Sequence, residues 1–193
     1  GGMYSQAIEA YPDLQIQQIY NDIRSQLNSS IVPKNWPELF ELIESVKEPL
    51  VFCIDEFPYL VSTDPSVPSQ FQKWLDHTKK RNLFVILCGS SQRTMLNEFL
   101  NAASPLYGRA DCILKIEPMN YAAFCLATHC PYGDIDSFKK YSLVGGIPKY
   151  WTYVDKSTPI LELIEDLYFA SGSYLEGEPK RLLLDENVNG LAP

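Results

Sequence analysis

Histidine, basic residues and long apolar runs are all scarce in this chain, and each shortage excludes a class of protein. Two histidines far apart in the sequence, and five cysteines without a CxxC pair, are too scattered for a zinc–thiolate site. No apolar run is long enough to cross a bilayer, and no signal peptide is visible. Sixteen basic against twenty-four acidic residues give a net charge of −8, which argues against strong nucleic-acid binding by this chain alone.

The cysteines are best interpreted as reduced thiols. Cys53, Cys88 and Cys112 lie in or beside apolar segments, where cysteine behaves as a small hydrophobic residue. With no signal peptide, this predicts a cytoplasmic protein. At 193 residues, of which 46% are hydrophobic, the chain is long enough to bury a substantial core.

Helical spacing and short apolar runs alternate along the first part of the chain. Apolar residues from Ile16 to Leu27 recur at helical spacing, and Asn35 is expected to cap a second helix. The runs Val51–Ile54, Leu83–Leu87 and Cys112–Ile116 predict buried parallel strands, the first of them buried on both faces. The alternation predicts an α/β fold with a parallel sheet.

Beyond Pro118 the pattern is helical only. Asn120 and Asp136 are expected to cap helices, and another helix starts at residues 158–159. We therefore expect a boundary at about residues 117–118, with an α/β core over residues 1–117 and a small all-helical subdomain over residues 118–193.

Two adjacent carboxylates, Asp55 and Glu56, end the run Val51–Ile54, as in a Walker B motif. Carboxylates at the carboxyl end of a parallel strand are costly unless they are solvated, paired or bound to a cation. The next strand ends in two hydroxyl residues, Ser90 and Ser91. These side chains would suit a Mg²⁺ ligand, a base for an attacking water and a γ-phosphate sensor. The alternative is that the acids only start a turn and the serines cap a helix.

Four segments in order carry a resemblance to a known family. They are Cys-Ile-Asp-Glu-Phe-Pro-Tyr-Leu from residue 53, Cys-Gly-Ser-Ser from residue 88, Ser-Pro-Leu-Tyr-Gly-Arg-Ala from residue 104 and Val-Gly-Gly-Ile-Pro-Lys-Tyr-Trp from residue 144. From about Leu50 to Trp151 the chain resembles the archaeal-type ATPase family, in the AAA+/STAND branch of P-loop NTPases. The resemblance implies that the α/β part is a partial P-loop NTPase core and the helical part its lid.

The resemblance also implies roles for individual residues. Asp55 would be the Mg²⁺ carboxylate, Glu56 the catalytic base, and Ser90 or Ser91 the sensor of the γ-phosphate. ATP and Mg²⁺ are the implied cofactors of the parent protein.

Two further roles follow from the resemblance, and each has an alternative. Arg109 would be an arginine finger or a phosphate sensor, or else it forms a structural ion pair with a nearby acid. Pro148, in a GxP element, would pack on the adenine, or else it only follows a helix that ends in glycine.

One expected motif is missing, because the sequence nowhere contains G-x-x-x-x-G-K-[ST], the loop that cradles phosphates. The family carries this loop upstream, and the opening Gly1-Gly2-Met3 looks like a vector scar or an arbitrary cut. The family's winged helix and nuclease-like domain are expected beyond Pro193. The chain is therefore interpreted as an internal fragment that is itself inactive and binds no ATP or Mg²⁺.

Two functions from different classes remain open. The first is part of an ATP-dependent molecular switch that controls a DNA-binding or effector domain, with a transposition or DNA-repair ATPase of a neighbouring branch as a weaker variant. The second is a non-catalytic scaffold or partner-binding module. In AAA+ sheets the P-loop strand lies between the strands matching Leu83–Leu87 and Cys112–Ile116. Its absence predicts exposed sheet edges, compensated by self-association, by an N-terminal segment such as Tyr4–Ala10 in the gap, or by a split sheet. Self-association through the edges is the favoured outcome, and no membrane contact is expected.

Overall fold

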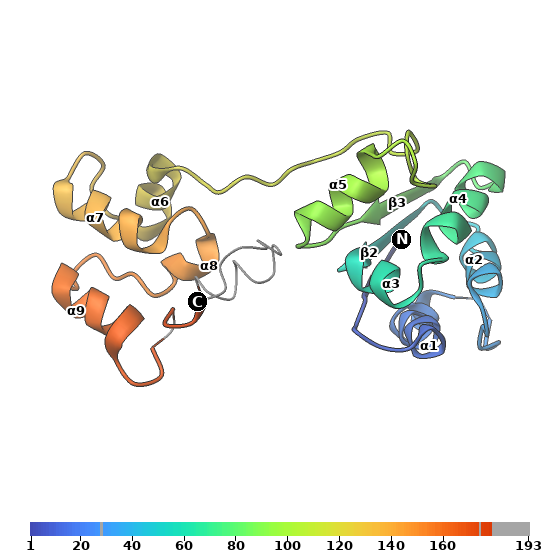
Figure 1. Cartoon of the computed structure of the whole chain (residues 1–193), viewed down its shortest axis with the longest axis horizontal. Coiled ribbons are helices and arrows are strands. Elements are labelled where there is room, and N and C mark those ends of the chain that lie inside the picture. Colours follow the sequence, from blue (N-terminus) through green and yellow to red (C-terminus); the bar gives the residue numbers. More distant parts are fainter. Residues whose placement is uncertain (28, 174, 179–193) are drawn as a thin grey trace. The chain divides into compact units, whose positions relative to one another are not determined.

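The structure is a computed structural model that describes residues 1–27, 29–173 and 175–178. Its chain forms two units, Gly1–Ile113 and Leu114–Pro193, which are described separately (Figure 1). The division follows Ile113, a few residues before the boundary that the sequence suggests. No helix among the described residues is long and apolar enough to span a membrane.

The first unit contains a sheet of three parallel strands in the order β1-β2-β3. Strand β1 is Gly2–Gln6, β2 is Leu50–Asp55 and β3 is Leu83–Leu87. The expected α/β fold is thereby confirmed. The apolar runs Val51–Ile54 and Leu83–Leu87 lie in parallel strands, as predicted.

Strand β1 was not predicted from the sequence, in which Gly1-Gly2-Met3 was interpreted as a vector scar or an arbitrary cut. Met3 and Ser5 are both buried, and Tyr4 lies opposite Cys53 of β2. The Ser5 hydroxyl donates a hydrogen bond of 2.6 Å to Asp22 in the first helix. The alternation of buried and exposed residues along β1 is that of a strand with one face against the core.

All the early helices contribute to one core on one face of the sheet, built around Met3, Phe52 and Ile54. The chain visits the strands in spatial order, and right-handed crossovers then place the connecting helices on the same side. The helices are α1 (Pro12–Ile23, followed by the 3₁₀ turn η1, Arg24–Gln26), α2 (Trp36–Glu44), α3 (Phe57–Thr63), α4 (Val67–His77) and α5 (Gln92–Leu100). As expected, Asn35 caps α2, its side chain accepting from the Glu38 N–H.

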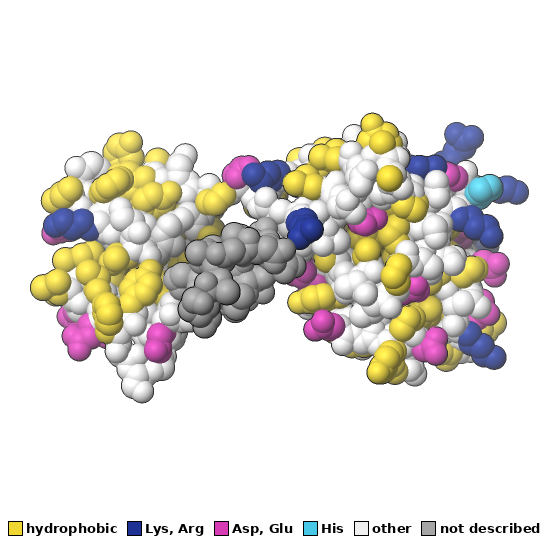
Figure 2. All heavy atoms as spheres, in the orientation of Figure 1, with side chains coloured by type: hydrophobic (Ala, Val, Ile, Leu, Met, Phe, Trp, Pro, Cys, Tyr) yellow, Lys and Arg dark blue, Asp and Glu magenta, His cyan; other side chains and the backbone are white. Residues whose placement is uncertain are grey.

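The other face of the sheet is exposed, so β2 is not buried on both faces as its composition predicts. We call this the open face, defined by Tyr4, Val51, Phe84 and Ile86, whose exposed fractions are 56%, 38%, 59% and 37%. Figure 2 shows that hydrophobic side chains remain at the surface of the first unit.

The predicted third strand, Cys112–Ile116, is wrong: this segment is irregular, and every residue from 110 to 120 is exposed. Its β-branched residues favour an extended backbone, but a strand also needs a hydrogen-bonding neighbour. Among the described residues, β3 pairs only with β2.

The second unit is helical. Asn120 caps its first helix, as expected, but Asp134 rather than Asp136 caps the next. Asp136 instead pairs with Lys139 at 2.9 Å. The helices are α6 (Tyr121–Thr128), α7 (Ile135–Val144), α8 (Pro148–Trp151) and α9 (Ile160–Ile164), which continues into the π-helical segment η2 (Glu165–Phe169).

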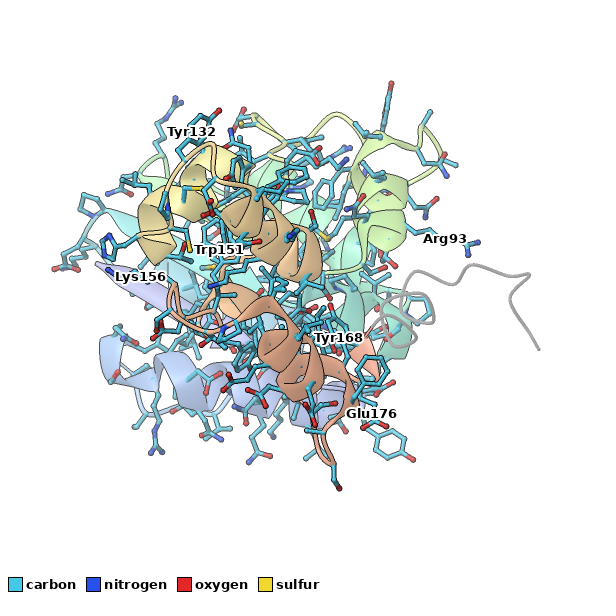
Figure 3. The ribbon with its side chains drawn as sticks, turned by 90° about the vertical axis from the view of Figure 1, so that its left-hand side faces the viewer. Arg93, Tyr132, Trp151, Lys156, Tyr168 and Glu176 are labelled. Atoms are coloured by element: carbon cyan, nitrogen blue, oxygen red, sulfur yellow. The ribbon has the colours of Figure 1, made fainter. Side chains whose placement is uncertain are left out.

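Aromatic side chains stabilise the second unit by packing in its core and by hydrogen bonding to backbone carbonyls. Phe124 and Trp151 are buried and meet edge to face, with ring centroids 5.6 Å apart. Trp151 Nε1 donates to the Gly145 carbonyl at 2.8 Å, and the Tyr168 hydroxyl donates to the Leu143 carbonyl at 2.5 Å (Figure 3). The helices and loops of this unit are thus tied by side-chain donors to backbone carbonyls.

Candidate functional site

Asp55, the last residue of β2, receives hydrogen bonds from three sides. Its Oδ1 accepts from the Glu56 N–H at 3.0 Å and from the Cys88 thiol at 3.4 Å. Its Oδ2 accepts from the Tyr4 hydroxyl at 3.0 Å. This bond raises the pKa of Tyr4, while burial, and then the bond to Asp55, raises the pKa of Cys88 to about 12. The carboxylate is therefore oriented by neutral donors, and within the described part of the chain no Lys or Arg forms an ion pair with it.

Glu56 follows in a left-handed backbone conformation, with φ of 53° and ψ of 41°. This region costs a residue other than glycine on the order of 1 kcal/mol. Directly after this turn, the start of α3 packs against the segment that follows β3, since a Cβ at Gly89 would lie 2.3 Å from Cδ of Pro58. Only glycine fits at residue 89 without displacing that proline.

The two serines after β3 have different partners. Ser90 donates to Oε2 of Glu56 from its hydroxyl at 3.0 Å and from its N–H at 3.3 Å. Ser91 caps α5, its hydroxyl accepting from the Thr94 N–H at 3.4 Å. The structure thus joins Glu56 to Ser90 and gives Ser91 the capping position. The catalytic and sensor roles of these residues stay predictions.

Arg109 lies in a different part of the first unit. Its Nε and Nη2 donate to the two carboxylate oxygens of Asp76 at 2.9 and 2.8 Å. Its Nη1 donates to the carbonyls of Pro105 and Tyr107 at 2.9 and 3.2 Å. The ion pair lowers the pKa of Asp76 and raises that of Arg109. This is the geometry of the structural alternative, in which the arginine fixes its loop to α4.

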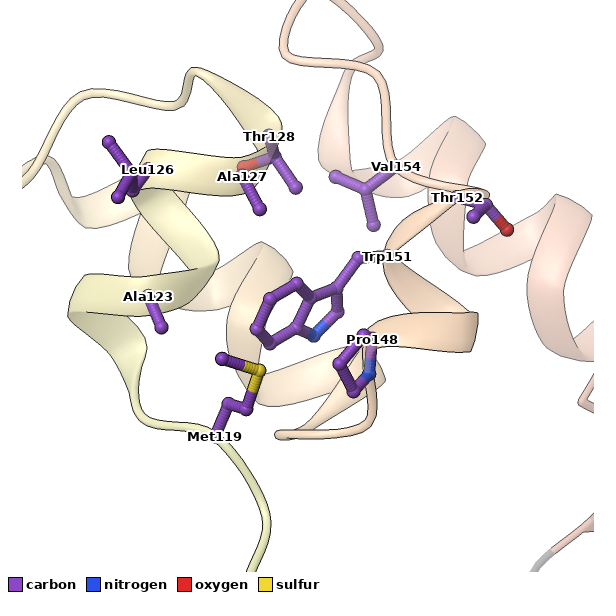
Figure 4. Close-up of a pocket in the computed structure, with 9 residues that line it drawn as sticks. All are labelled: Met119, Ala123, Leu126, Ala127, Thr128, Pro148, Trp151, Thr152 and Val154. Atoms are coloured by element: carbon purple, nitrogen blue, oxygen red, sulfur yellow. The ribbon is translucent and has the colours of Figure 1, made fainter. Parts of the chain in front are cut away.

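Pro148 begins α8 in the second unit and lines an open pocket of about 660 Å³. Figure 4 shows the Trp151 ring in this pocket, close to Met119 and Pro148. The backbones of Gly146 and Met119 are in contact: the Met119 N–H donates to the Gly146 carbonyl at 2.8 Å, and a Cβ at Gly146 would lie 2.4 Å from the Met119 carbonyl oxygen. The remaining lining residues are Ala123, Leu126, Ala127, Thr128, Thr152 and Val154.

The residues at the ends of β2 and β3 suit a Mg²⁺ ion that takes most of its ligands from water and phosphate. They do not suit a metal ion whose ligands all come from the protein. Among the described residues, no group of three or more histidine, cysteine, aspartate or glutamate side chains could hold a metal ion. Mg²⁺ in nucleotide sites usually takes one or two carboxylates, with water and phosphate oxygens completing its shell. From the residues that the structure describes, Oδ2 of Asp55 accepts the Tyr4 bond alone, which leaves a lone pair for such a ligand.

Tyr4 and Cys88 are the contacts of Asp55 that the sequence did not predict. Cys88 was interpreted only as a small hydrophobic residue, and Tyr4 was named only as the start of a segment, Tyr4–Ala10, that could fill the gap in the sheet. The alternation in Gly-Met-Tyr-Ser-Gln was the available signal for β1, and it would have placed Tyr4 beside β2.

Comparison with known proteins decides the family. Residues 5–154 match the model of an ATPase domain found predominantly in Archaea. The chain belongs to this family. It is also similar to the uncharacterized protein MJECL04 of Methanocaldococcus jannaschii, with 32% identity over 133 residues. That alignment covers 64% of this chain and 29% of the archaeal protein, so the chain spans less than a third of the relative's length.

Proposed function

We propose that this chain is the Walker B, sensor and lid portion of an ATP-binding and ATP-hydrolysing molecular switch of the AAA+/STAND type. The observation that carries the proposal is the joining of Asp55, Glu56 and Ser90 at the ends of two parallel strands. Membership of an ATPase family supports it.

Each residue has a separate task in this proposal. Asp55, held by Tyr4 and Cys88, is the carboxylate for Mg²⁺, which would neutralise charge on the phosphates. Glu56 orients the attacking water and accepts its proton. Ser90 holds Glu56 in place and lies at the sensor position next to it.

The phosphate-binding loop belongs, in this proposal, to another segment of the parent protein. Its strand would lie along the unpaired side of β3, and its helix would cover the open face of Tyr4, Val51, Phe84 and Ile86. The short coverage of the archaeal relative supports a longer parent. Further domains of the parent would contact DNA or an effector.

In this proposal Arg109 and Pro148 also contact the nucleotide. Arg109 senses phosphate if it first leaves Asp76, because that carboxylate now uses two of its nitrogens. Pro148 belongs to the lid and packs on the adenine. It lines a pocket of the second unit that is open to solvent.

The second candidate is a non-catalytic scaffold or partner-binding module. One observation favours it: the Arg109 guanidinium is engaged in an ion pair with Asp76. On this alternative the carboxylates at the strand ends have only a local structural role.

Calorimetry with Mg-ATP tests the fragment itself. Without the amides and the lysine of a phosphate-binding loop, most charge-assisted phosphate contacts are missing. We expect no saturable binding up to millimolar ATP, and micromolar affinity would overturn the assignment of the loop to another segment.

Turnover by the parent protein tests the site. Glu56→Gln should keep ATP binding and abolish hydrolysis, because the amide cannot accept a proton. Asp55→Ala should weaken Mg²⁺-dependent binding or turnover. Glu41→Gln, an exposed change on α2, is the matched control and should leave both unchanged. Normal turnover in both site variants would favour the scaffold.

A further inference from the structure

The Tyr4 side chain reaches from β1 to the carboxyl end of β2. In the register of the two strands Tyr4 lies opposite Cys53, yet its hydroxyl donates to Oδ2 of Asp55, two residues further along, at 3.0 Å. Two residues of a parallel strand rise about 6.6 Å, a length that a tyrosine side chain spans. The ring therefore runs along β2 toward the candidate site, and a shorter side chain at this position would not reach the carboxylate.

Both oxygens of the Asp55 carboxylate accept a hydrogen bond. Oδ1 accepts from the Glu56 N–H at 3.0 Å and from the Cys88 thiol at 3.4 Å. The last torsion of an aspartate side chain is otherwise broad, so donors on both oxygens fix the plane of the carboxylate. A thiol is a weak donor and its bond here is the longer one, which makes Tyr4 the stronger of the two side-chain donors.

The bond from Tyr4 orients the carboxylate without neutralising it and without adding much to folding. A phenol is neutral, so Asp55 keeps its charge for a cation. The Tyr4 side chain is more than half exposed, and a hydrogen bond at an exposed position competes with water. The effect of this hydroxyl should therefore be on the orientation of Asp55 rather than on stability.

We propose that Tyr4 is a positioning residue for the Mg²⁺ site, its hydroxyl fixing the orientation of the Asp55 carboxylate that would bind the ion. This inference rests on the proposed function, in which Asp55 is the Mg²⁺ carboxylate. Removing a group that hydrogen-bonds to a metal-binding carboxylate typically weakens metal binding about tenfold to a hundredfold. The bond joins β1 to β2, so it does not depend on what covers the open face.

Nuclear magnetic resonance of the full 193-residue chain tests the orientation without nucleotide. Tyr4→Phe removes only the hydroxyl, and it should shift the amide resonance of Glu56, because that N–H donates to the same carboxylate. Tyr11→Phe removes the hydroxyl of an exposed tyrosine before α1 and, as the matched control, should leave the Glu56 amide unchanged. Both variants should melt at the temperature of the wild type. An unchanged Glu56 amide in Tyr4→Phe would overturn the proposal.

Metal affinity of the nucleotide-bound parent protein tests the consequence for the site, with Mn²⁺ as the probe and electron paramagnetic resonance as the readout. Tyr4→Phe should raise the Mn²⁺ dissociation constant about tenfold. Cys88→Ala should have a smaller effect, because the thiol is the weaker donor, and Cys88→Ser should restore the affinity because it keeps a hydroxyl donor. Tyr11→Phe should bind Mn²⁺ as the wild type does.

A double-mutant cycle shows whether Tyr4 acts through Asp55. In a parent that already carries Asp55→Asn, adding Tyr4→Phe should cause no further loss of Mn²⁺ affinity, since the carboxylate that Tyr4 orients is gone. A further loss as large as in the wild-type background would show that Tyr4 acts by another route, which contradicts its positioning role.

The same measurements separate this inference from the proposed function. If Asp55→Asn alone leaves the Mn²⁺ affinity unchanged, Asp55 is not the metal carboxylate, and the proposed function and the role of Tyr4 both fail. If Asp55→Asn weakens Mn²⁺ binding while Tyr4→Phe binds as the wild type does, the metal site stands and only the role of Tyr4 is overturned.

Discussion

The two units of this chain are stabilised by different kinds of contact. In the first unit, Trp36, Phe40, Phe71 and Trp74 form an aromatic cluster beneath the sheet, with Phe40 and Trp74 stacked at 4.2 Å between ring centroids. In the second unit the core is smaller, and polar side chains reach from its edge to backbone carbonyls. One of them is the buried Lys140, whose Nζ donates to the carbonyls of residues 155 and 156 at 2.9 and 2.7 Å.

Because the stabilising contacts differ, the two units should tolerate different substitutions. A close-packed apolar cluster loses stability when volume is removed, because the cavity is only partly refilled. A small core closed by side-chain donors loses stability when a donor is removed, because a charged or polar hydrogen bond to the backbone is lost. The following predictions are ordered from the largest expected effect to the smallest.

Phe71→Ala should have the largest effect. Phe71 is fully buried and contacts Trp36, Phe40, Phe57 and Trp74. The free energy of unfolding of the first unit should fall by about 3–5 kcal/mol. Urea denaturation followed by circular dichroism measures it.

The matched control for this change is Phe84→Ala, the same substitution on the open face. It should cost less than about 1 kcal/mol when measured at low protein concentration, because the side chain is already exposed. Similar losses in the two variants would show that the open face is covered in solution.

Lys140→Met should have an intermediate effect, confined to the second unit. The methionine keeps most of the apolar stem but leaves the carbonyls of Asp155 and Lys156 without their donor. We expect a loss of about 1–3 kcal/mol. Lys139→Met removes only the exposed pair with Asp136 and should change stability by less than about 0.5 kcal/mol. Equal effects at residues 139 and 140 would contradict the role given to the buried donor.

Asp76→Asn should give the smallest effect, and one that depends on pH. The pKa of Asp76 is lowered from 3.8 in the folded chain by its bond to Arg109. The stabilisation is therefore complete above pH 3.8 and disappears as the pH falls through the lower folded value. The melting temperatures of wild type and variant should differ at neutral pH and converge in acid. A difference that stays constant with pH would show that the carboxylate's charge is not what stabilises the loop.

The parts of the fold that depend on local pattern could be predicted from the sequence. Strands β2 and β3 appear as apolar runs, and the Asn35 cap follows from side-chain chemistry within one turn. The strand predicted at Cys112–Ile116 failed because a strand depends on a neighbour as well as on propensity. Burial of β2 on one face only is likewise set by where the helices pack, which periodicity does not report.

For the candidate site, too, the sequence predicts which residues lie near one another but not their detailed geometry. Asp55, Glu56 and Ser90 could be placed near one another because adjacent parallel strands end at one edge of a sheet. The left-handed backbone of Glu56 and the contact of Cys88 with Asp55 depend on how the two strand ends meet in space. No spacing in the sequence encodes either of them.

Each of the two units is contiguous in the chain, and this sets the order in which they can form during synthesis. A ribosome completes Gly1–Ile113 before it has made the residues of the second core, so the first unit can fold while the rest is being translated.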